Sequence, residues 1–285
     1  MYAIISEKLK VLISAKGAEP IGVFANGYEH NWLWSGQAPW QRSAPLLFPI
    51  VGRLKADSFS HEGRNFSLAQ HGFARDEVFD VEFSSQQKIN LCLRSNSRTS
   101  ERFPFDFVLG VSYEVLDARL LAKYTVQNVG REVMYFNLGW HPGFVLPRHE
   151  SSKKKLSSPK SFHKYSLLDK GLLNFSSQVD LFDVHEVDIK SNSFASDAWV
   201  FVNSGQREVN LSNESGDMIS VKANAPHWGV WSNDPLKFVC IEPWWGHADV
   251  SNGSGELKDK QGIQSLDPGT VWHSEAEVEF RFGRR

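Results

Sequence analysis

Three short motifs in this sequence place a side chain that can move a proton at the end of an apolar run or in a glycine turn. His141 follows the strand-like "REVMYFNLGW" and precedes a proline, Glu242 follows "FVCI" and precedes a proline, and His71 opens "HGFARD". A carboxylate that an apolar strand carries inward is costly to bury unless it is paired or used. Side chains held by strands are also well positioned for catalysis. These residue types therefore point to general acid–base chemistry.

Each motif also has a purely structural interpretation. His141 could be a hydrogen-bonded core histidine, and Glu242 could form a buried ion pair with Arg53 of "FPIVGRL". The stretch from His71 to Asp76 could be a charged turn on the surface. These interpretations weaken when the motifs are taken together, since each of them presents a group suited to proton transfer.

The elements that must hold these residues are strands. Apolar and polar side chains alternate in residues 120–127 and again in residues 274–282, the period of half-buried strands. Turn signals such as "HEGR" at 61–64 and "NESGD" at 213–217 separate the runs. No amphipathic stretch of ten or more residues has a helical period. The pattern predicts an all-β sandwich.

Residues 1–285 are expected to form a single domain, because a β-sandwich or barrel can reach this length. Residues 147–161, "PRHESSKKKLSSPKS", could mark a break. However, the flanking runs are alike and no linker composition persists. The lysines at 153–155 predict a solvated loop, since three charges fall short of a basic tract.

The composition excludes several classes of protein. The formal net charge is −2, which argues against nucleic acid or an anionic membrane as a partner. The two cysteines, Cys92 and Cys240, lie far apart in apolar runs and favour a reducing compartment. No apolar run approaches a membrane span, and the first residues lack the order of a signal peptide. We expect a cytoplasmic protein, with its oligomeric state left open.

The ten tryptophans have two interpretations. Large rings commonly fill a large core. One or two of them, Trp244 in particular, could instead form the wall of a sugar site, since a sugar ring has apolar C–H faces.

Taken in order, "FPIVGRL", "QHGFARDEVF", "NLGWHPGF" and "CIEPWWGHAD" resemble the aldose 1-epimerase (galactose mutarotase-like) family, and within it the LacX-like branch. The resemblance runs from Gly17 to "LDPGTVW". It implies a large antiparallel β-supersandwich with a sugar cleft. It also implies interconversion of the α- and β-anomers of free aldoses, with neither cofactor nor metal.

The resemblance assigns roles residue by residue. The family's catalytic histidine matches His141 and its catalytic glutamate matches Glu242. Its supporting histidine matches His71, and its substrate-holding arginine matches Arg53. Asp197 in "FASDAWVF" is a looser match to a substrate-binding aspartate.

The chain departs from the galactose enzymes in two places. They have a histidine followed by two glycines where this chain has "HGFARD", and an asparagine–arginine pair where it has Gly52 and Arg53. Hexose-6-phosphate 1-epimerases share the "HGFAR" form. Arg75 could therefore bind a phosphate as a planar fork, or only brace its loop. The acidic neighbours Asp76 and Glu77 partly cancel its field, which favours a neutral aldose.

Anomer exchange needs a base at the C1 hydroxyl and an acid at the ring oxygen. A desolvated carboxylate beside Trp244 has a raised affinity for protons, which suits Glu242 to the base. His141 suits the acid, since histidine titrates near neutral pH. Arg53 and Asp197 would hold remote hydroxyls, so that C1 rotates without the rest of the sugar.

Three other functions stay open. Two histidines and a glutamate are also ligands of catalytic zinc or non-haem iron, although H-E-x-x-H is absent. Glu242 and Asp197 could form the carboxylate pair of a glycosidase. A sugar-binding protein without catalysis is the third, because fold does not fix function.

Overall fold

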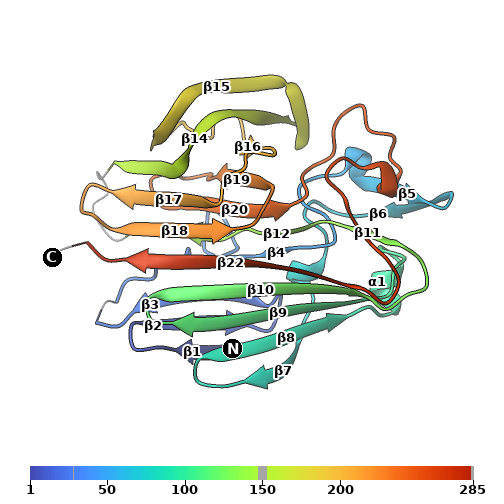
Figure 1. Ribbon diagram of the computed structural model, residues 1–285, viewed down its shortest axis with the longest axis horizontal. Helices are drawn as coiled ribbons and strands as arrows, with labels where there is room; N and C mark the ends of the chain where they lie inside the picture. Colours follow the sequence, from blue (N-terminus) through green and yellow to red (C-terminus); the bar gives the residue numbers. More distant parts are fainter. Residues whose placement is uncertain (28, 147–152, 284–285) are drawn as a thin grey trace.

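The computed structural model describes residues 1–27, 29–146 and 153–283, and strands make up most of them. Figure 1 shows one long, twisted sheet that runs through the whole molecule, with a small sheet packed against one end of it. Every pairing between named strands is antiparallel. The predicted all-β, antiparallel β-supersandwich is confirmed.

The large sheet follows an order that differs strongly from the order along the chain. In space its strands are β4 (Leu46–Leu47), β12 (Leu138–Trp140), β20 (Val239–Trp245), β19 (His227–Trp231), β16 (Trp199–Phe201), β14 (Lys154–Asp169), β17 (Glu208–Asn213), β18 (Met218–Ala223), β22 (Val271–Arg281), β10 (Arg119–Asn128), β9 (Phe107–Leu116), β8 (Lys88–Arg94) and β7 (Asp80–Ser84). Off this path, β13 (Gly143–Phe144) pairs with β20, and β15 (Leu172–Ile189) pairs with β14.

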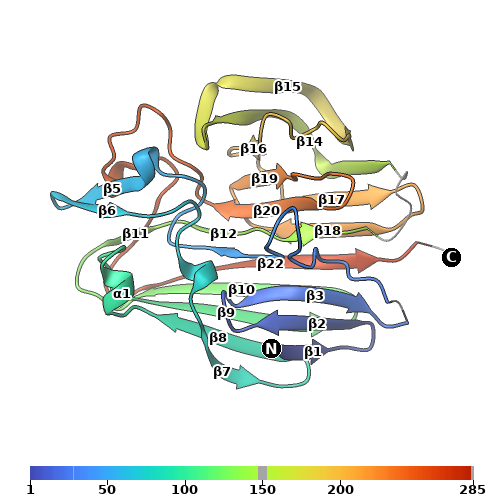
Figure 2. The same ribbon diagram turned by 180° about the vertical axis from the view of Figure 1, so that it is seen from behind.

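Three smaller sheets and four short helical turns complete the described part of the chain. The sheets are β1 (Tyr2–Ile5), β2 (Leu9–Ser14) and β3 (Glu19–Ala25); β5 (Ser58–His61) and β6 (Arg64–Ser67); and β11 (Met134–Phe136) and β21 (Gln264–Leu266). The turns are α1 (Ser97–Ser100), η1 (Lys55–Asp57), η2 (Ala74–Asp76) and η3 (Leu257–Asp259). In Figure 2 the sheet β1–β3 lies over β8–β10, and this packing makes the second layer.

The two strands predicted from alternation form and pair with each other. Leu120 of β10 lies opposite Val278 of β22, and Ala122 lies opposite Ala276. All four side chains are buried in the main core, because one face of each strand packs while the other meets water. As expected, no helix of ten residues occurs in the described ranges, and none of their helices could span a membrane.

The solvated loop predicted around the lysines at 153–155 holds for Lys153, which is exposed and lies outside any strand, and is wrong from Lys154 on. β14 begins at Lys154, whose side chain is buried and donates to the carbonyl of Pro235 at 2.7 Å. Residues 147–152 lie outside the described ranges. Polar composition misled the prediction because a carbonyl acceptor from a distant segment compensates the buried ammonium.

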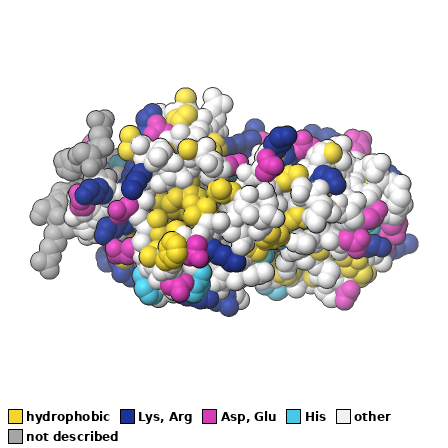
Figure 3. Space-filling model, turned by 90° about the horizontal axis from the view of Figure 1, so that it is seen from above, with side chains coloured by type: hydrophobic (Ala, Val, Ile, Leu, Met, Phe, Trp, Pro, Cys, Tyr) yellow, Lys and Arg dark blue, Asp and Glu magenta, His cyan; other side chains and the backbone are white. Residues whose placement is uncertain are grey.

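β15 pairs with β14, which belongs to the large sheet, and the two form a long hairpin at the top of Figure 1. Its outer strand exposes Phe175 and Phe182. Figure 3, which views the molecule from this side, shows hydrophobic side chains bordered by charged ones.

Candidate active site

β20 has two different faces, and Glu242 lies on the one that faces away from the main core. Ile241 and Trp245 pack into the main core, whereas Cys240, Glu242 and Trp244 point the other way. This is the alternation that any strand imposes. Glu242 is 1% exposed, and the indole of Trp244 donates to its Oε2 at 3.1 Å.

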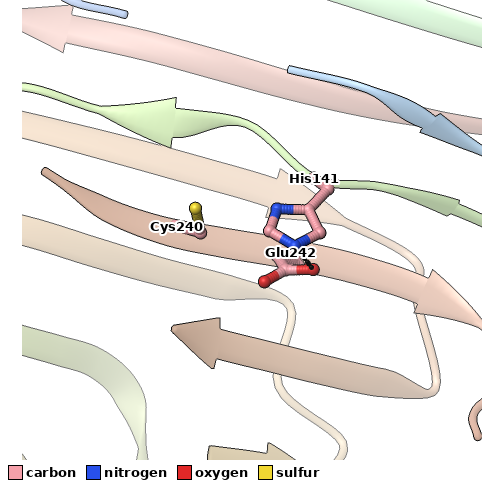
Figure 4. A group of neighbouring side chains, drawn as sticks. All are labelled: His141, Cys240 and Glu242. Carbon is pink, nitrogen blue, oxygen red and sulfur yellow. Dashed lines mark ion pairs between the residues drawn. The ribbon is translucent and has the colours of Figure 1, made fainter. Parts of the chain in front are cut away.

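His141 reaches Glu242 from the segment between β12 and β13. Its backbone N–H donates to the carbonyl of Pro45 at 3.0 Å, and its Nε2 lies 3.3 Å from Oε2 of Glu242 (Figure 4). Strand β12 pairs with β20, so the sheet itself sets the distance between these two side chains. The structure thus brings together two residues that are 101 positions apart in the sequence.

His71 is held by an unusual backbone. Its φ is +68° and that of Gly72 is +69°, and a Cβ at Gly72 would come within 2.3 Å of the carbonyl oxygen of Phe48. Only glycine fits this second position. The N–H of Gly52 donates to Nδ1 of His71 at 3.1 Å, so a neutral ring carries its proton on Nε2. The ring meets that of His141 edge to face at 5.5 Å.

These side chains surround one cavity of about 330 Å³, within the range of small-molecule sites. Six of the seven site residues predicted from the sequence line it: His71, Arg75, His141, Asp197, Glu242 and Trp244.

Arg53 is the exception. Its Nε lies 2.9 Å from Oδ1 of Asp57, its side chain is 43% exposed, and it is not among the residues that line the cavity. The turn at Lys170 and Gly171 packs against its methylenes. Contrary to the sequence interpretation, the geometry offers Arg53 neither contact with the cavity nor an ion pair with Glu242.

Arg75 lies in the cavity wall, and Asp76 compensates its charge in part. Its guanidinium donates to a backbone carbonyl of its own turn at 2.7 Å, and its Nε is buried without a hydrogen-bond partner among the described residues. Asp76 is engaged by Arg42 at 2.8 Å and lies 4.0 Å from Arg75, while Glu77 is engaged by Arg102 at 2.7 Å. Asp76 therefore cancels the charge of Arg75 in part, as expected, whereas Glu77 is engaged by Arg102.

Several lining residues were not singled out by sequence reasoning. Trp40 stacks on His141 with ring centroids 4.9 Å apart, and Trp231 meets the same ring edge to face at 5.8 Å. Leu168 and Leu173, from the β14–β15 hairpin, add an apolar wall. Tryptophan clusters were a signal for the first two. No sequence signal marked the leucines, since their position depends on how the hairpin folds back.

Burial determines the protonation of the central pair. It raises the pKa of Glu242 well above its ordinary value, and Asp197 adds to the rise while the Trp244 hydrogen bond opposes it. Burial lowers the pKa of His141 to about 3. Burial also lowers the pKa of His71, with contributions from His141 and Arg75. Burial therefore favours the uncharged forms of both Glu242 and His141.

Two groups of side chains in the described residues have ligand atoms close enough to share a metal ion. One is His141, Cys240 and Glu242, all buried, and the other is His61, Glu62 and Glu132 near the surface. His71 belongs to neither group. The ligand set considered for a catalytic zinc, His71 with His141 and Glu242, is therefore not gathered in this geometry.

Comparison with known proteins gives a consistent result. The aldose 1-epimerase family model matches residues 1–279. The chain is 26% identical over 260 residues to the chromosomal protein LacX of Lactococcus lactis subsp. lactis, which covers 84% of this chain and 85% of that protein. A galactose mutarotase related enzyme from Lactobacillus acidophilus superposes with a TM-score of 0.91 at 31% identity, covering 99% of this chain and 97% of the other. A galactose mutarotase-like protein from Lactobacillus casei ATCC 334 also gives 0.91, at 25% identity and with 99% and 100% covered.

Proposed function

Because the chain belongs to the aldose 1-epimerase family, we propose that it interconverts the α- and β-anomers of an aldose by opening and reclosing the sugar ring. The observation that carries this proposal is the 3.3 Å contact between His141 and Glu242 at the wall of a cavity of small-molecule size. Ring opening requires an acid and a base at the two oxygens of one carbon, and this pair supplies both.

The pair holds one transferable proton, which starts on Glu242. His141 would then take the proton of the C1 hydroxyl as the C1–O5 bond breaks, and Glu242 would protonate the departing ring oxygen. After C1 turns by half a rotation, the ring hydroxyl attacks its other face. Glu242 recovers its proton, and His141 returns the other one. The sequence interpretation assigned the base to Glu242 and the acid to His141, and the burial of both groups favours the reverse starting state.

The remaining cavity residues would position the sugar. The Nε2–H of a neutral His71 can donate to an oxygen of the ring, since its Nδ1 is already occupied by Gly52. Asp197 can accept from a remote hydroxyl. Trp40 and Trp244 offer aromatic faces for the C–H side of a pyranose. Held at these points, the sugar body stays fixed while C1 rotates. We propose no cofactor or metal for this reaction.

The test is the rate of anomer exchange, followed by NMR for a panel of aldoses. Glu242→Gln removes the transferable proton and His141→Asn removes its acceptor, and each should lower kcat by roughly 10²–10⁴. His227→Asn is a matched control, since it replaces another buried histidine that does not line the cavity. Wild-type rates in Glu242→Gln would refute the proposal, as would activity lost in EDTA and restored by a divalent metal. Sugar binding without any anomer exchange would support the alternative of a sugar-binding protein that is not an enzyme.

A phosphorylated aldose is the second candidate substrate, and Arg75 favours it. The preference for a neutral sugar depended on Asp76 and Glu77 partly cancelling its charge. Arg102 engages Glu77, and Asp76 is shared between Arg42 at 2.8 Å and Arg75 at 4.0 Å, so the cancellation is incomplete. The free guanidinium edge can therefore form charge-assisted hydrogen bonds with a phosphate. Arg75→Ala should then lower kcat/KM for glucose-6-phosphate on the order of tenfold or more, with glucose little affected, as bonds of about 1.5–3 kcal/mol are lost. Arg119→Ala, at an arginine that does not line the cavity, is the control. An unchanged ratio between the two sugars would assign Arg75 a bracing role.

We further propose that the protein works in the cytoplasm as a single domain over residues 1–285. Its two cysteines are unpaired and buried, as expected in a reducing compartment.

A further inference from the structure

Cys240 is a buried thiol beside the catalytic pair, and the proposed reaction does not use it. It precedes Glu242 by two positions on β20, so both side chains leave the same face of the strand. Its thiol is fully buried next to Trp34 and Phe238. In Figure 4 the imidazole of His141 reaches toward β20 over the face that carries both residues.

We propose that His141, Cys240 and Glu242 form a binding site for a soft divalent metal ion such as Zn²⁺, and that this ion inhibits anomer exchange by occupying both catalytic groups. The inhibitory part rests on the function proposed above, whereas the binding part does not. One ligand atom from each residue lies within 4.8 Å of the other two. Zinc bonds of about 2.0–2.3 Å require only small side-chain movements from there.

A second observation points to a ligand at this place. Nδ1 of His141 is buried and has no hydrogen-bond partner among the described residues, and the residue is only 8% exposed. A histidine that serves only structure normally satisfies both ring nitrogens. Because the ring can present a nitrogen lone pair beside a thiol and a carboxyl group, the site offers the nitrogen, sulfur and oxygen ligands that zinc accepts.

The proton balance of binding defines its pH dependence. Burial, with a contribution from Glu242, raises the pKa of the Cys240 thiol. The ion must therefore displace the thiol proton and, where Glu242 is protonated, the carboxyl proton as well, and both pass to the solvent. Binding should tighten as the pH rises. A thiolate also selects soft ions, so Mg²⁺ and Ca²⁺ should not compete.

The bound ion would act as an inhibitor rather than as a cofactor. It would use a lone pair of His141 and an oxygen of Glu242, and proton transfer needs the same two side chains. Three protein ligands leave a fourth position for water. Zn²⁺ and the aldose should therefore compete, and chelation should preserve or raise activity.

The experiment measures Zn²⁺ binding by calorimetry, using metal-free protein without a polyhistidine tag. One ion per chain should bind the wild type, and Cys240→Ser and Cys240→Ala should each weaken binding tenfold or more. Cys92→Ser, which replaces the other buried free cysteine, should bind like the wild type. Titration in two buffers of different ionisation enthalpy counts the released protons. With Co²⁺ as the probe, a thiolate-to-metal absorption band should appear in the wild type and be absent from Cys240→Ser.

Activity separates the two proposals. Cys240 does not line the cavity, so Cys240→Ser should retain anomer exchange while losing its sensitivity to Zn²⁺. Equal Zn²⁺ affinity in the wild type and both Cys240 variants would overturn the metal site, and anomer exchange that bound Zn²⁺ leaves unchanged would overturn the inhibition. Zn²⁺ binding through Cys240 in a protein with no exchange activity would uphold the site and refute the proposed function.

Discussion

The protein should lose much of its stability between pH 7 and pH 5, because it buries four histidines in the neutral form. Burial lowers the pKa of His141 and of His227 to about 3 and that of His247 to about 4, and it also lowers the pKa of His71. In the unfolded chain these groups titrate near 6.5. Below that pH the unfolded chain binds protons that the native state does not bind. Their contribution is therefore complete above pH 6.5 and is lost as the pH falls toward 3–4.

The size of this loss of stability follows from the difference between the pH and the unfolded-state histidine pKa of about 6.5. At pH 5 His141, His227 and His247 cost roughly 2 kcal/mol each, about 6 kcal/mol together. His71 acts in the same direction. Glu242 acts in the opposite direction, since its raised pKa in the native state favours folding as the pH falls. That gain is at most about 2.7 kcal/mol over two pH units. The net loss of about 3 kcal/mol or more is a large part of the whole stability of many domains.

The variant His227→Asn isolates one of these contributions. Nδ1 of His227 accepts the N–H of Asn203 at 3.2 Å, and the Oδ1 of an asparagine can accept it instead. Urea unfolding followed by tryptophan fluorescence at pH 7 and pH 5 gives the fall in the free energy of unfolding. In the variant this fall should be smaller by roughly 2 kcal/mol. His273→Asn, at an exposed position, should leave the fall as it is in the wild type. If the free energy of unfolding falls by the same amount in His227→Asn and in the wild type, His227 is not held neutral and the reasoning fails.

Three further predictions concern the cavity. The double variant of Glu242→Gln and His141→Asn should be little slower in anomer exchange than either single variant, because residues that act as a unit are not additive; multiplied losses would mean independent roles. Trp40→Ala should lower kcat by up to about tenfold and shift its pH profile, since ring stacking is worth about 0.5–1.5 kcal/mol. Trp40→Phe should retain most of the rate. Equal rates in the two variants would exclude a role for stacking. By thermal unfolding, Gly72→Ala should cost on the order of 2 kcal/mol or more, since its Cβ would lie 2.3 Å from a backbone oxygen. Gly63→Ala, at a similar φ in open space, should cost only about 1 kcal/mol, and equal costs would exclude the clash.

The sequence predicted well where a local pattern decides the outcome. Alternation in residues 120–127 and 274–282 predicts β10 and β22, because a period of two fixes which face is buried. The same rule puts Glu242 on the face of β20 that lines the cavity. The prolines after His141 and Glu242 and the glycine after His71 mark chain positions that the fold brings together.

It failed where contacts with distant segments decide the position of a charged side chain. Arg53 packs under a turn 117 positions away and pairs with Asp57 instead of facing the cavity. Asp76 is shared between Arg75 and Arg42, which comes from 34 positions away, so it compensates Arg75 only in part. Neighbours in the sequence show which charges are available, but not which of them meet. The hairpin that adds the leucine wall is likewise fixed by contacts between distant segments.

The position of β22 constrains how the chain can fold during synthesis. β22 is made after every other described strand, yet it lies inside the sheet, between β18 and β10. Until it leaves the ribosome, β10 of the strands β7–β10 and β18 of the cavity half are open edges with no strand between them. The nascent chain must therefore keep two unjoined sheets in solution, each with exposed backbone that other chains could pair with. β22 pairs with β10 on one side and with β18 on the other, so its insertion covers both open edges at once.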